Sequence, residues 1–333
     1  MTRDNSSDVS VIGSGSWGTA IVKMLLPNCR KVSWYIHDRD TLKHIKRHHN
    51  NPHFLSSVSF NTEKLYLTDN INRAIASSEV IILVTPSEYL KSTLDPVAYP
   101  MDNKLVCTAI KGIVPEYNIV VGEFIHNYYS VPWDNLVVLT GPSHAEEVAM
   151  EKLTYITLAS LNPKGAKKIA SLVRNSYVST LLSDDIFGTE YAAVMKNIYS
   201  IAAGISAGLG YGDNFLAVLL SNAAGEMKKF VDTIRENNRE INSSAYLGDL
   251  LVTGYSQFSR NRVFGNMIGK GYSVSNALLG MSMVAEGYPS AKCIYSVITK
   301  MGLSLPIAET VYRILYESAS PSSEIANLSK KLV

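Results

Sequence analysis

Short apolar runs alternate with amphipathic segments through the first half of the chain. Apolar runs bounded by Gly, Pro and Ser predict buried strands, and five lie at Val9–Ile12, Lys31–Ile36, Val80–Val84, Leu105–Thr108 and Val137–Thr140. Between several of them the apolar spacing is helical, for example at Trp17–Leu26, Thr41–His48 and Ile71–Ser77. Strands that alternate with helices form parallel βαβ units, so this half predicts a doubly wound parallel sheet. We expect a further crossover at its edge, formed by Tyr155–Ala159, a Lys-rich amphipathic stretch and Tyr177–Leu181.

The pattern changes after about Asp185. From Phe187 onward the periodicity is helical, with Ala- and Gly-rich stretches and no convincing strand run. Residues Tyr191–Leu209 are apolar on nearly every face, which predicts one long helix in the core between two domains. A length of 333 residues also favours two domains. The sequence therefore predicts an α/β fold, with a Rossmann-type domain at residues 8–187 and an all-α domain at residues 188–333.

Composition excludes several classes of partner. The net charge of +2 provides no general basic field for nucleic acid or anionic lipid, so any phosphate recognition must be local. The three cysteines, Cys29, Cys107 and Cys293, are far apart and form no disulfide framework, which suits a reducing cytoplasm. The polar N-terminus lacks the apolar stretch of a signal peptide, and the apolar runs are too short to span a bilayer. We expect a cytoplasmic protein with no membrane span and no nucleic-acid partner.

A glycine motif follows the first predicted strand directly. Gly13, Gly15 and Gly18 form G-x-G-x-x-G between that strand and a helix. In this context the first glycine permits a tight turn, the second lets backbone approach a pyrophosphate, and the third lets helix and strand pack closely. The helix N-terminus adds free N–H groups and a positive dipole end for the phosphates. The pattern predicts a dinucleotide site.

The end of the second predicted strand should read the adenosine ribose. An acid there favours NADH, whereas a basic residue accepts the 2′-phosphate of NADPH. His37 lies at the expected contact position, but Asp38 and Arg39 point to opposite preferences, and Arg39 could equally lie in a solvated turn. The basic His37 favours use of both cofactors with a weak preference for NADPH, and the sequence leaves that preference open.

Further motifs run through both predicted domains in a fixed order. They are Gly13–Ala20 (GSGSWGTA), Val84–Ser87 (VTPS), Ala109–Ile113 (AIKGI), Gly141–Val148 (GPSHAEEV), Val194–Asn197 (VMKN), Leu247–Leu250 (LGDL), Ser259–Arg262 (SRNR) and Ala285–Gly287 (AEG). With this order and spacing, the chain resembles bacterial NAD(P)-dependent glycerol-3-phosphate dehydrogenases over nearly its whole length. The resemblance implies reduction of dihydroxyacetone phosphate to sn-glycerol 3-phosphate by NADH or NADPH, and a biosynthetic role in supplying glycerol 3-phosphate for phospholipids.

The resemblance also implies site residues. The cofactor would be bound by the glycines Gly13, Gly15 and Gly18 together with Ser16, Trp17, His37, Lys111, Ala145, Arg260, Val284 and Glu286. The substrate would be bound by Lys111, Gly141, Ser143, Lys196, Asp249, Ser259, Arg260 and Asn261. Lys196 and Asp249 would be catalytic, with Lys196 stabilising the oxyanion and supplying the proton.

Some of these residues also have structural interpretations. Lys196 interrupts a helix otherwise free of charge; burial would lower its pKa toward the range of an acid–base catalyst, but a lysine can instead extend to water. Asp249 in an apolar stretch is the obvious partner for Lys196, or else a helix N-cap. Ser143 could cap a helix that begins after Gly141. Ser259, Arg260 and Asn261 combine a hydroxyl, a guanidinium and an amide, which suits a phosphate.

The chain departs from the family at two places. Phe215-Leu216 stands where an Ala-Arg pair is common, and Ser221-Asn222-Ala223 replaces a common Thr-Arg-Gly. The loss of two basic positions puts regulatory or subunit contacts in doubt more than the chemistry. A homodimer is compatible with the sequence, which leaves the oligomeric state open.

Three alternatives remain. His44 and His48 are four residues apart, as in some metal sites, but Lys46 and Arg47 surround them, so we expect no metal. A two-domain reductase of the β-hydroxyacid or ketopantoate kind would share the architecture. A catalytically silent NAD(P)-sensing protein would be expected to lack Lys196 or Asp249.

Overall fold

The computed structural model describes residues 7–281 and 283–333. The polar start of the chain, residues 1–6, therefore lies outside the described residues, as does residue 282. Two compact units make up the chain: one contains the residues up to Ile110 together with Val121–Ile186, and the other contains Lys111–Val120 and Phe187–Val333. The sequence places the boundary near residue 187 but does not anticipate that residues 111–120 belong with the helical part. We refer to them as the sheet unit and the helical unit.

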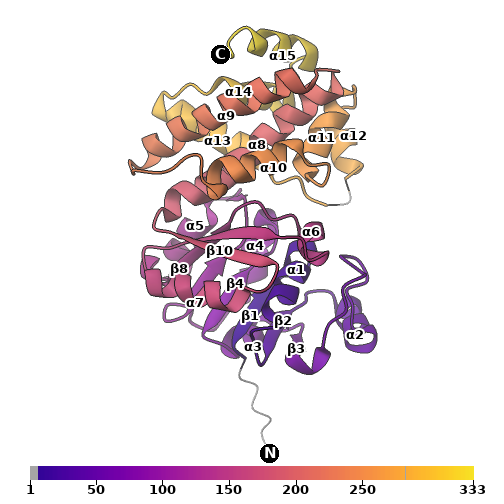
Figure 1. The fold of residues 1–333 in the computed structure, drawn as a ribbon, viewed down its shortest axis with the longest axis vertical. Helices are drawn as coiled ribbons and strands as arrows, with labels where there is room; N and C mark the ends of the chain where they lie inside the picture. The colour runs from indigo at the N-terminus through magenta and orange to yellow at the C-terminus, as the bar shows by residue number, and fades with distance from the viewer. Residues whose placement is uncertain (1–6, 282) are drawn as a thin grey trace, which may run out of the picture. The chain divides into compact units, whose positions relative to one another are not determined.

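The sheet unit is built on an eight-stranded sheet in the order β10-β9-β8-β5-β4-β1-β2-β3 (Figure 1). Its strands are β1 (Val9–Ile12), β2 (Val32–Tyr35), β3 (Leu65–Thr68), β4 (Val80–Leu83), β5 (Leu105–Thr108), β8 (Leu136–Thr140), β9 (Thr154–Ala159) and β10 (Val178–Ser183). Every pair is parallel except β8 with β9. The predicted doubly wound sheet is confirmed, and β9 and β10 form the expected parallel crossover at the edge.

Helices connect these strands. They are α1 (Ser16–Leu25), α2 (Arg39–His48), α3 (Ile71–Ala76), α4 (Ser87–Leu94), α5 (Val121–Tyr129), α6 (Ala145–Ala149) and α7 (Pro163–Val173), with 3-10 turns at Thr62–Lys64 and Trp133–Asn135. All four residues of β1, β2 and β4 are buried, as expected for parallel strands covered on both faces. The Trp34 indole Nε1 donates to the Gly13 carbonyl at 2.9 Å, which fixes β2 to the glycine turn after β1.

The sequence did not predict three features of the strands. β3 is missed because only two of its four residues are aliphatic, and Tyr66 is not fully buried. The antiparallel pairing of β8 and β9 depends on the short connection through the five-residue α6, which a strand pattern does not reveal. The hairpin of β6 (Ile113–Val114) and β7 (Ile119–Val120) consists of strands of two residues, too short for a periodicity to register.

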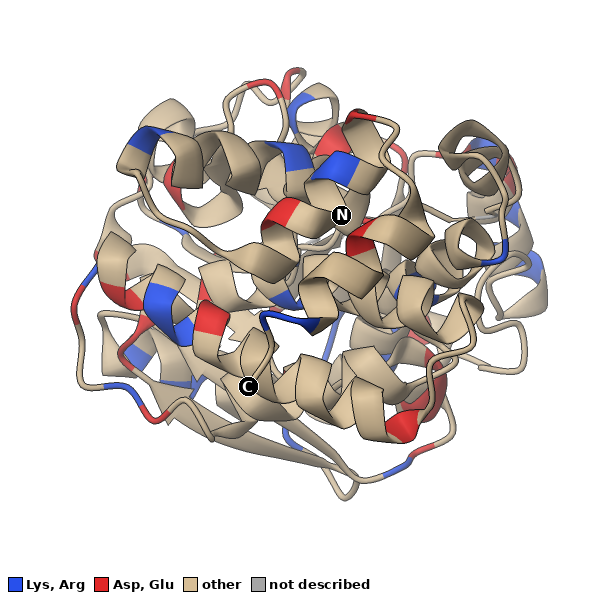
Figure 2. Cartoon of the chain, turned by 90° about the horizontal axis from the view of Figure 1, so that it is seen from above, with Lys and Arg blue, Asp and Glu red and all other residues tan. Residues whose placement is uncertain are grey.

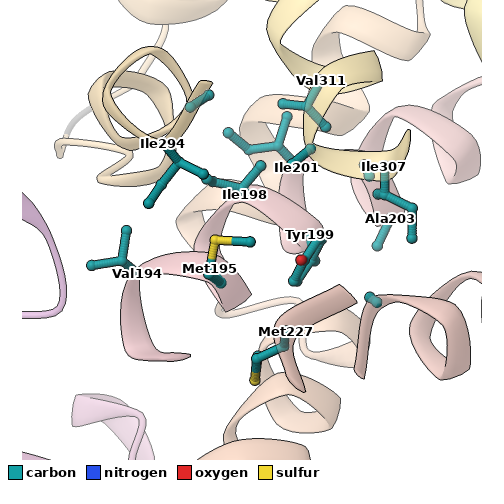
Figure 3. Close-up of a cluster of buried hydrophobic side chains, with 14 of the residues drawn as sticks. Val194, Met195, Ile198, Tyr199, Ile201, Ala203, Met227, Ile294, Ile307 and Val311 are labelled. Carbon is teal, nitrogen blue, oxygen red and sulfur yellow. The ribbon is translucent and has the colours of Figure 1, made fainter. Parts of the chain in front are cut away.

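The helical unit contains the remaining helices. They are α8 (Ile186–Gly208), α9 (Asp213–Ile234), α10 (Asp249–Tyr255), α11 (Arg260–Gly269), α12 (Val274–Leu279), α13 (Gly287–Met301), α14 (Pro306–Tyr316) and α15 (Pro321–Ser329), with a π-helical turn at Ser244–Gly248 before α10. The long helix expected over Tyr191–Leu209 is present as α8, which begins five residues earlier and ends one residue earlier. Figure 3 shows its apolar side chains in the unit's core, among them Val194, Met195 and Ile198.

Helices α8 and α11 approach each other closely through small residues. A Cβ added at Gly204 would lie 2.1 Å from the Arg262 carbonyl oxygen, and one at Gly265 would lie 2.2 Å from the Ile201 carbonyl oxygen. Neither position tolerates a side chain, because the clash is with backbone that cannot move aside. This packing holds the residues at the start of α11 beside the helix that carries Lys196.

Charges of both signs are dispersed. Figure 2 shows blue and red segments interspersed over helices and loops, in keeping with a net charge of +2. Among the described helices, none combines the length and the apolar character that crossing a membrane requires.

Candidate active site

The predicted glycine fingerprint adopts the geometry that its spacing requires. Gly13 has φ +127°, and a Cβ there would lie 3.0 Å from the Thr85 backbone nitrogen at the end of β4. A Cβ on Gly18 would lie 2.4 Å from the Gly13 carbonyl oxygen, so only glycine lets α1 start this close to β1. At Gly15, by contrast, a Cβ would meet nothing within 4 Å. Open space above Gly15 is what a pyrophosphate needs.

Polar atoms around this turn support a dinucleotide there. The Trp17 indole Nε1 and the Thr85 hydroxyl are buried and have no hydrogen-bond partner among residues 7–281 and 283–333. Buried polar atoms rarely stay unpaired, so these two donors fit a ligand that would satisfy them. Asn51, fully buried, donates to the Ser14 carbonyl and the Thr19 hydroxyl, each at 2.9 Å, and so fixes the turn from outside the motif. Sequence reasoning missed Asn51, since no local pattern reveals it.

The end of β2 carries the residues expected at the adenosine ribose. The His37 side chain is exposed, and its Nδ1 lies 3.3 Å from the Tyr35 hydroxyl. The Asp38 carboxylate caps α2 by accepting from the Thr41 N–H at 2.7 Å. Arg39 pairs with Asp69, with 2.7 Å between Nε and Oδ2. In this turn the Asp38 carboxylate and the Arg39 guanidinium are therefore already engaged, by the start of α2 and by Asp69 respectively.

The segment after β8 differs from the expectation in one respect. Gly141 has φ +105° and leaves no room for a side chain, because a Cβ would lie 2.9 Å from the Tyr155 carbonyl oxygen. The interpretation of Ser143 as a helix cap is wrong: His144 is the N-cap of α6, and the Ser143 hydroxyl donates to the Gly141 carbonyl at 3.0 Å. A side chain one residue too early cannot cap the helix. Ala145 is buried as the first residue of α6.

The helical unit contains a buried charge cluster. Lys196 and Asp249 are 6% and 1% exposed, and 3.0 Å separates the Lys196 Nζ from Asp249 Oδ1. Lys111, the first residue of the hairpin segment, places its Nζ 2.8 Å from Asp249 Oδ2. One carboxylate therefore joins two ammonium groups that are 85 residues apart in the chain. The alternative of a lysine extended to water does not apply to Lys196, and the N-cap of α10 is Gly248 rather than Asp249.

Neutral groups complete the cluster. The Lys196 Nζ donates to the Thr253 hydroxyl at 2.7 Å, and that hydroxyl in turn donates to the Asp249 carbonyl at 2.6 Å. The Asn197 amide donates to the Lys111 carbonyl at 2.7 Å, which ties the hairpin segment to α8. Thr253 and Asn197 were missed from the sequence. Thr253 lies one helical turn after Asp249, and that spacing is the signal that could have found it.

Burial and neighbouring charges shift the pKa values of Lys196 and Asp249. Burial lowers the pKa of Lys196 to about 8, although the Asp249 charge acts in the opposite direction. Burial alone would raise the pKa of Asp249, but the charges of Lys111 and Lys196 outweigh it and hold that pKa below its ordinary value. The outcome at neutral pH is an ionised carboxylate beside a lysine that can exchange a proton near physiological pH.

The Ser259–Asn261 turn begins α11. Ser259 caps the helix by accepting from the Arg262 N–H, and its hydroxyl lies 2.8 Å from that of Ser200 on α8. The Asn261 side-chain oxygen accepts from the Gly287 N–H at 2.9 Å, which places Glu286 at the first turn of α11. Arg260 is only partly buried, and its charge contributes to lowering the pKa of Lys196. Val284 and Glu286 are also partly exposed.

His44 and His48 lie side by side on α2. The His44 and His48 rings lie 4.4 Å apart, and His44 Nε2 is 3.2 Å from the Asn50 side-chain oxygen. Within residues 7–281 and 283–333, no group of three or more His, Cys, Asp or Glu side chains is arranged to hold a metal ion.

Known proteins resemble this chain over nearly its full length. Residues 8–166 match the family model described as NAD-dependent glycerol-3-phosphate dehydrogenase N-terminus, and residues 185–326 match the corresponding C-terminus. A glycerol-3-phosphate dehydrogenase (NAD(P)+) of Exiguobacterium sp. is 34% identical over 98% of this chain and 96% of its own length. One of Lactobacillus acidophilus is 33% identical over 96% of each chain. The crystal structure of glycerol-3-phosphate dehydrogenase from Coxiella burnetii has a TM-score of 0.89 at 26% identity, covering 97% of this chain and 99% of that one.

The structural likeness covers residues of both units, and the second family model begins at residue 185, close to the boundary at Phe187. About one third of the residues are identical to those of these relatives over nearly the full length. The glycine turn and the buried Lys196–Asp249 pair agree with this likeness. The chain therefore belongs to the NAD-dependent glycerol-3-phosphate dehydrogenase family.

Proposed function

We propose that this protein is an NAD(P)-dependent glycerol-3-phosphate dehydrogenase that reduces dihydroxyacetone phosphate to sn-glycerol 3-phosphate, reversibly. The observation that supports the proposal is the buried Lys111–Asp249–Lys196 cluster, because its proton donor and two positive charges could stabilise the negative charge that a ketone oxygen gains during reduction. Family membership and the printed names of the relatives support the same substrate pair.

A bound NADH or NADPH supplies the hydride for this chemistry. Gly13, Gly15 and Gly18 would receive its pyrophosphate, with Ser16, Trp17 and His37 along the dinucleotide and Ala145, Val284 and Glu286 as further contacts. The open space above Gly15 and the unpaired Trp17 and Thr85 donors support this assignment.

We assign the proton transfer to Lys196. As C2 of the substrate gains a hydride, its carbonyl oxygen becomes an alkoxide that the Lys196 ammonium stabilises and protonates, leaving a neutral amine. A pKa of about 8 allows the ammonium form to dominate at neutral pH while still releasing its proton. Asp249 holds the Lys196 Nζ in place together with Thr253, and Lys111 provides a second cation for the substrate. In the oxidation direction the neutral Lys196 amine accepts the proton.

Arg260 is the group we assign to the substrate phosphate. Its guanidinium matches two phosphate oxygens in a planar fork, and it is less buried than Ser259 or Asn261. Ser259 and the Asn261 amide nitrogen would add donors from the same turn, and the Asn261 oxygen is already used by Gly287. Gly141 and Ser143 complete the proposed substrate contacts.

The test is a spectrophotometric assay of NADPH and NADH oxidation with dihydroxyacetone phosphate, with ketopantoate and without substrate. We expect oxidation of both cofactors with dihydroxyacetone phosphate alone, and sn-glycerol 3-phosphate as the product. Faster turnover of ketopantoate would favour a ketopantoate-type reductase. Cofactor binding without turnover of either ketone would favour an NAD(P)-sensing protein.

The cellular setting belongs to the same proposal. Three separated, buried, free cysteines suit the cytoplasm, where the product would supply glycerophospholipid synthesis. A homodimer remains a proposal that sedimentation at several protein concentrations would test.

A further inference from the structure

Opposite charges meet where β2 and β3 end. Tyr35 pairs with Thr68 in the parallel register of these strands, and the Ile36 N–H donates to the Thr68 carbonyl at 2.9 Å. Arg39, at the start of α2, and Asp69, directly after β3, therefore both follow strands that end at the same edge of the sheet. This edge is the carboxyl end of β2, where a Rossmann domain reads the adenosine ribose.

Asp69 holds the arginine of this turn. The Arg39 Nε lies 2.7 Å from Asp69 Oδ2, and the two side chains are 80% and 38% exposed. The charge of Asp69 also reaches Tyr35, where it adds to burial in raising the pKa of the phenol. The other acid of the turn, Asp38, faces the N-terminus of α2 and does not hold Arg39. The guanidinium is thus engaged by one carboxylate from the neighbouring strand.

The two cofactors differ at this position. NADPH carries a phosphate on the 2′ oxygen of the adenosine ribose, whereas NADH carries a hydroxyl there. A free arginine would bind that phosphate in a planar fork. Asp69 opposes this in two ways, because it competes for the guanidinium and because its own negative charge repels the phosphate.

We propose that Asp69 is a specificity-determining residue, which lowers the affinity for a 2′-phosphate by retaining Arg39. The inference rests on the dinucleotide site of the proposed function and adds the residue that adjusts its choice of cofactor. The ion pair is well exposed, and such pairs are weak, so the effect should be modest, about 2- to 5-fold in affinity. Both cofactors would then be used, with a ratio that depends on one carboxylate.

The test measures binding of the adenosine half alone, by titration calorimetry of the full chain with adenosine 2′,5′-bisphosphate and with adenosine 5′-monophosphate. Asp69→Asn should tighten binding of the bisphosphate about 2- to 5-fold and change binding of the monophosphate less than about 2-fold. Dissociation constants for NADPH and NADH should shift in the same ratio. Unchanged binding of the monophosphate shows at the same time that the variant is folded.

Asp40→Asn is the matched control. Asp40 is one residue from Arg39, exposed, and paired with Lys43 at 3.0 Å, so its removal deletes the same charge nearby without releasing Arg39. We expect a change of less than about 2-fold in bisphosphate affinity, because exposed charges are screened. An equal gain in both variants would show that net charge, and not the release of Arg39, sets the preference, which overturns the proposal.

Arg39→Met completes a double-mutant cycle. Alone it should weaken the bisphosphate only about 2-fold, since Asp69 already occupies the guanidinium, and in the Asp69→Asn background it should abolish the gain. A gain that survives without Arg39 contradicts the proposal, and so does a large loss in Arg39→Met alone. If the monophosphate binds normally but no variant changes the ratio, only this inference is overturned. If neither nucleotide binds the unmodified protein, the dinucleotide site itself is wrong.

Discussion

Lys196 and Asp249 show how two ionisable side chains can remain buried. Each would be costly to bury alone, because a charge removed from water loses its hydration. Together with Lys111 they give two positive charges and one negative charge, with the Asp249 carboxylate shared between the two ammonium groups. Burial still outweighs the carboxylate at Lys196, since the pKa falls to about 8. The Lys196 ammonium is therefore suited to give up its proton near physiological pH.

Changing Lys196 to Ala should lower kcat by roughly 10²–10⁴-fold while NADPH still binds. The glycine turn lies in the sheet unit and Lys196 in the helical unit, so cofactor affinity and turnover should separate. Asp249→Asn should act through the same unit, and the double variant should be little worse than Lys196→Ala alone. Steady-state kinetics and cofactor titration test this. Strictly additive losses, or a near-normal kcat in Lys196→Ala, would show that the pair does not carry the chemistry.

The pH profile follows from the same pKa. If Lys196 supplies the proton, as proposed, reduction needs its ammonium form, and kcat/KM for dihydroxyacetone phosphate should fall as the pH rises through about 8. The Asp249 charge raises the pKa of Lys196, so Asp249→Asn should move this fall to lower pH. Profiles of both proteins between pH 6 and 10 test the shift. A midpoint that stays in place, or moves upward, would mean that another group controls the basic limb.

The sequence shows only part of this arrangement at the residue scale. Lys196 stands out as the one charge in a long apolar stretch, and Asp249 stands out in the same way. Thr253 and Asn197 do not, because Thr and Asn are common in helices and their partners come from packing. A cap was one of two roles considered for Ser143, because Ser is a common cap, but the helix begins after His144.

At the scale of elements, α9 and α14 are joined by a carboxylate that no motif reveals. The Glu226 carboxylate, on α9, accepts from the Ile307 N–H at 2.6 Å and from the Ala308 N–H at 3.4 Å, and so satisfies the first turn of α14. Burial nevertheless raises the pKa of Glu226 to about 7, and the nearby Glu309 charge adds to it, while the two amides and the Tyr199 hydroxyl oppose it. The Glu226 carboxyl group therefore connects α9 to α14 and changes its protonation near neutral pH.

This link predicts how stability changes with pH. The folded-state pKa of Glu226 lies above its ordinary value of 4.5, so the folded protein binds more protons than the unfolded chain between these two values. The contribution of Glu226 to stability should therefore be greatest below pH 4.5 and should decline as the pH rises through about 7, by about 3 kcal/mol at most. Above that pH the loss is complete.

Glu226→Gln keeps an acceptor for the Ile307 N–H and removes the titration. Urea unfolding followed by far-UV circular dichroism at pH 5.5, 7 and 8.5 should show the original protein losing stability relative to this variant as the pH rises. Glu324→Gln on α15 is the control. Glu324 pairs with the partly exposed Arg313, and this substitution should not reproduce the trend. A constant difference between the original protein and Glu226→Gln would show that Glu226 is ionised throughout.

The strands were more predictable than their directions. Short, mostly apolar runs identified β1, β4 and β5, because strands covered on both faces do not show an alternation of polar and apolar residues. The antiparallel direction of β9 depends on how the chain turns after β8. The five-residue α6 is too short to carry the chain back along the sheet, as the helix of a full crossover would, so β9 runs opposite to β8. Direction is set by a connection, whereas a periodicity describes only the strand.

At the scale of the whole molecule, the boundary between the units crosses the chain more than once. The segment Lys111–Val120 leaves the sheet unit after β5, adds the β6–β7 hairpin to the helical unit, and returns at α5. Ile113 and Val120 are at most 1% exposed in the core of the helical unit. Lys111 therefore reaches Asp249 because the hairpin is anchored there. A sequence pattern indicates a domain boundary where the hydrophobic periodicity changes from that of strands to that of helices. The ten residues of this segment contain no long helix or strand, so no such change marks them.

Ile113→Ala tests this organisation, because the two units carry different spectroscopic signals. All three tryptophans, Trp17, Trp34 and Trp133, belong to the sheet unit, whereas most of the long helices belong to the helical unit. Replacing a buried isoleucine by alanine costs about 2–5 kcal/mol. If the hairpin belongs to the helical unit, the far-UV circular dichroism transition should move to lower urea more than the tryptophan fluorescence transition.

Ile169→Ala on α7 is the matched control, since Ile169 is fully buried in the core of the sheet unit and should move the fluorescence transition instead. Ile113→Ala should also raise KM for dihydroxyacetone phosphate, because a loosened hairpin no longer fixes Lys111 beside Asp249. Circular dichroism and fluorescence transitions that shift equally in both variants would mean that the two cores unfold as one. The hairpin would then stabilise both units equally, although it packs in the core of the helical unit.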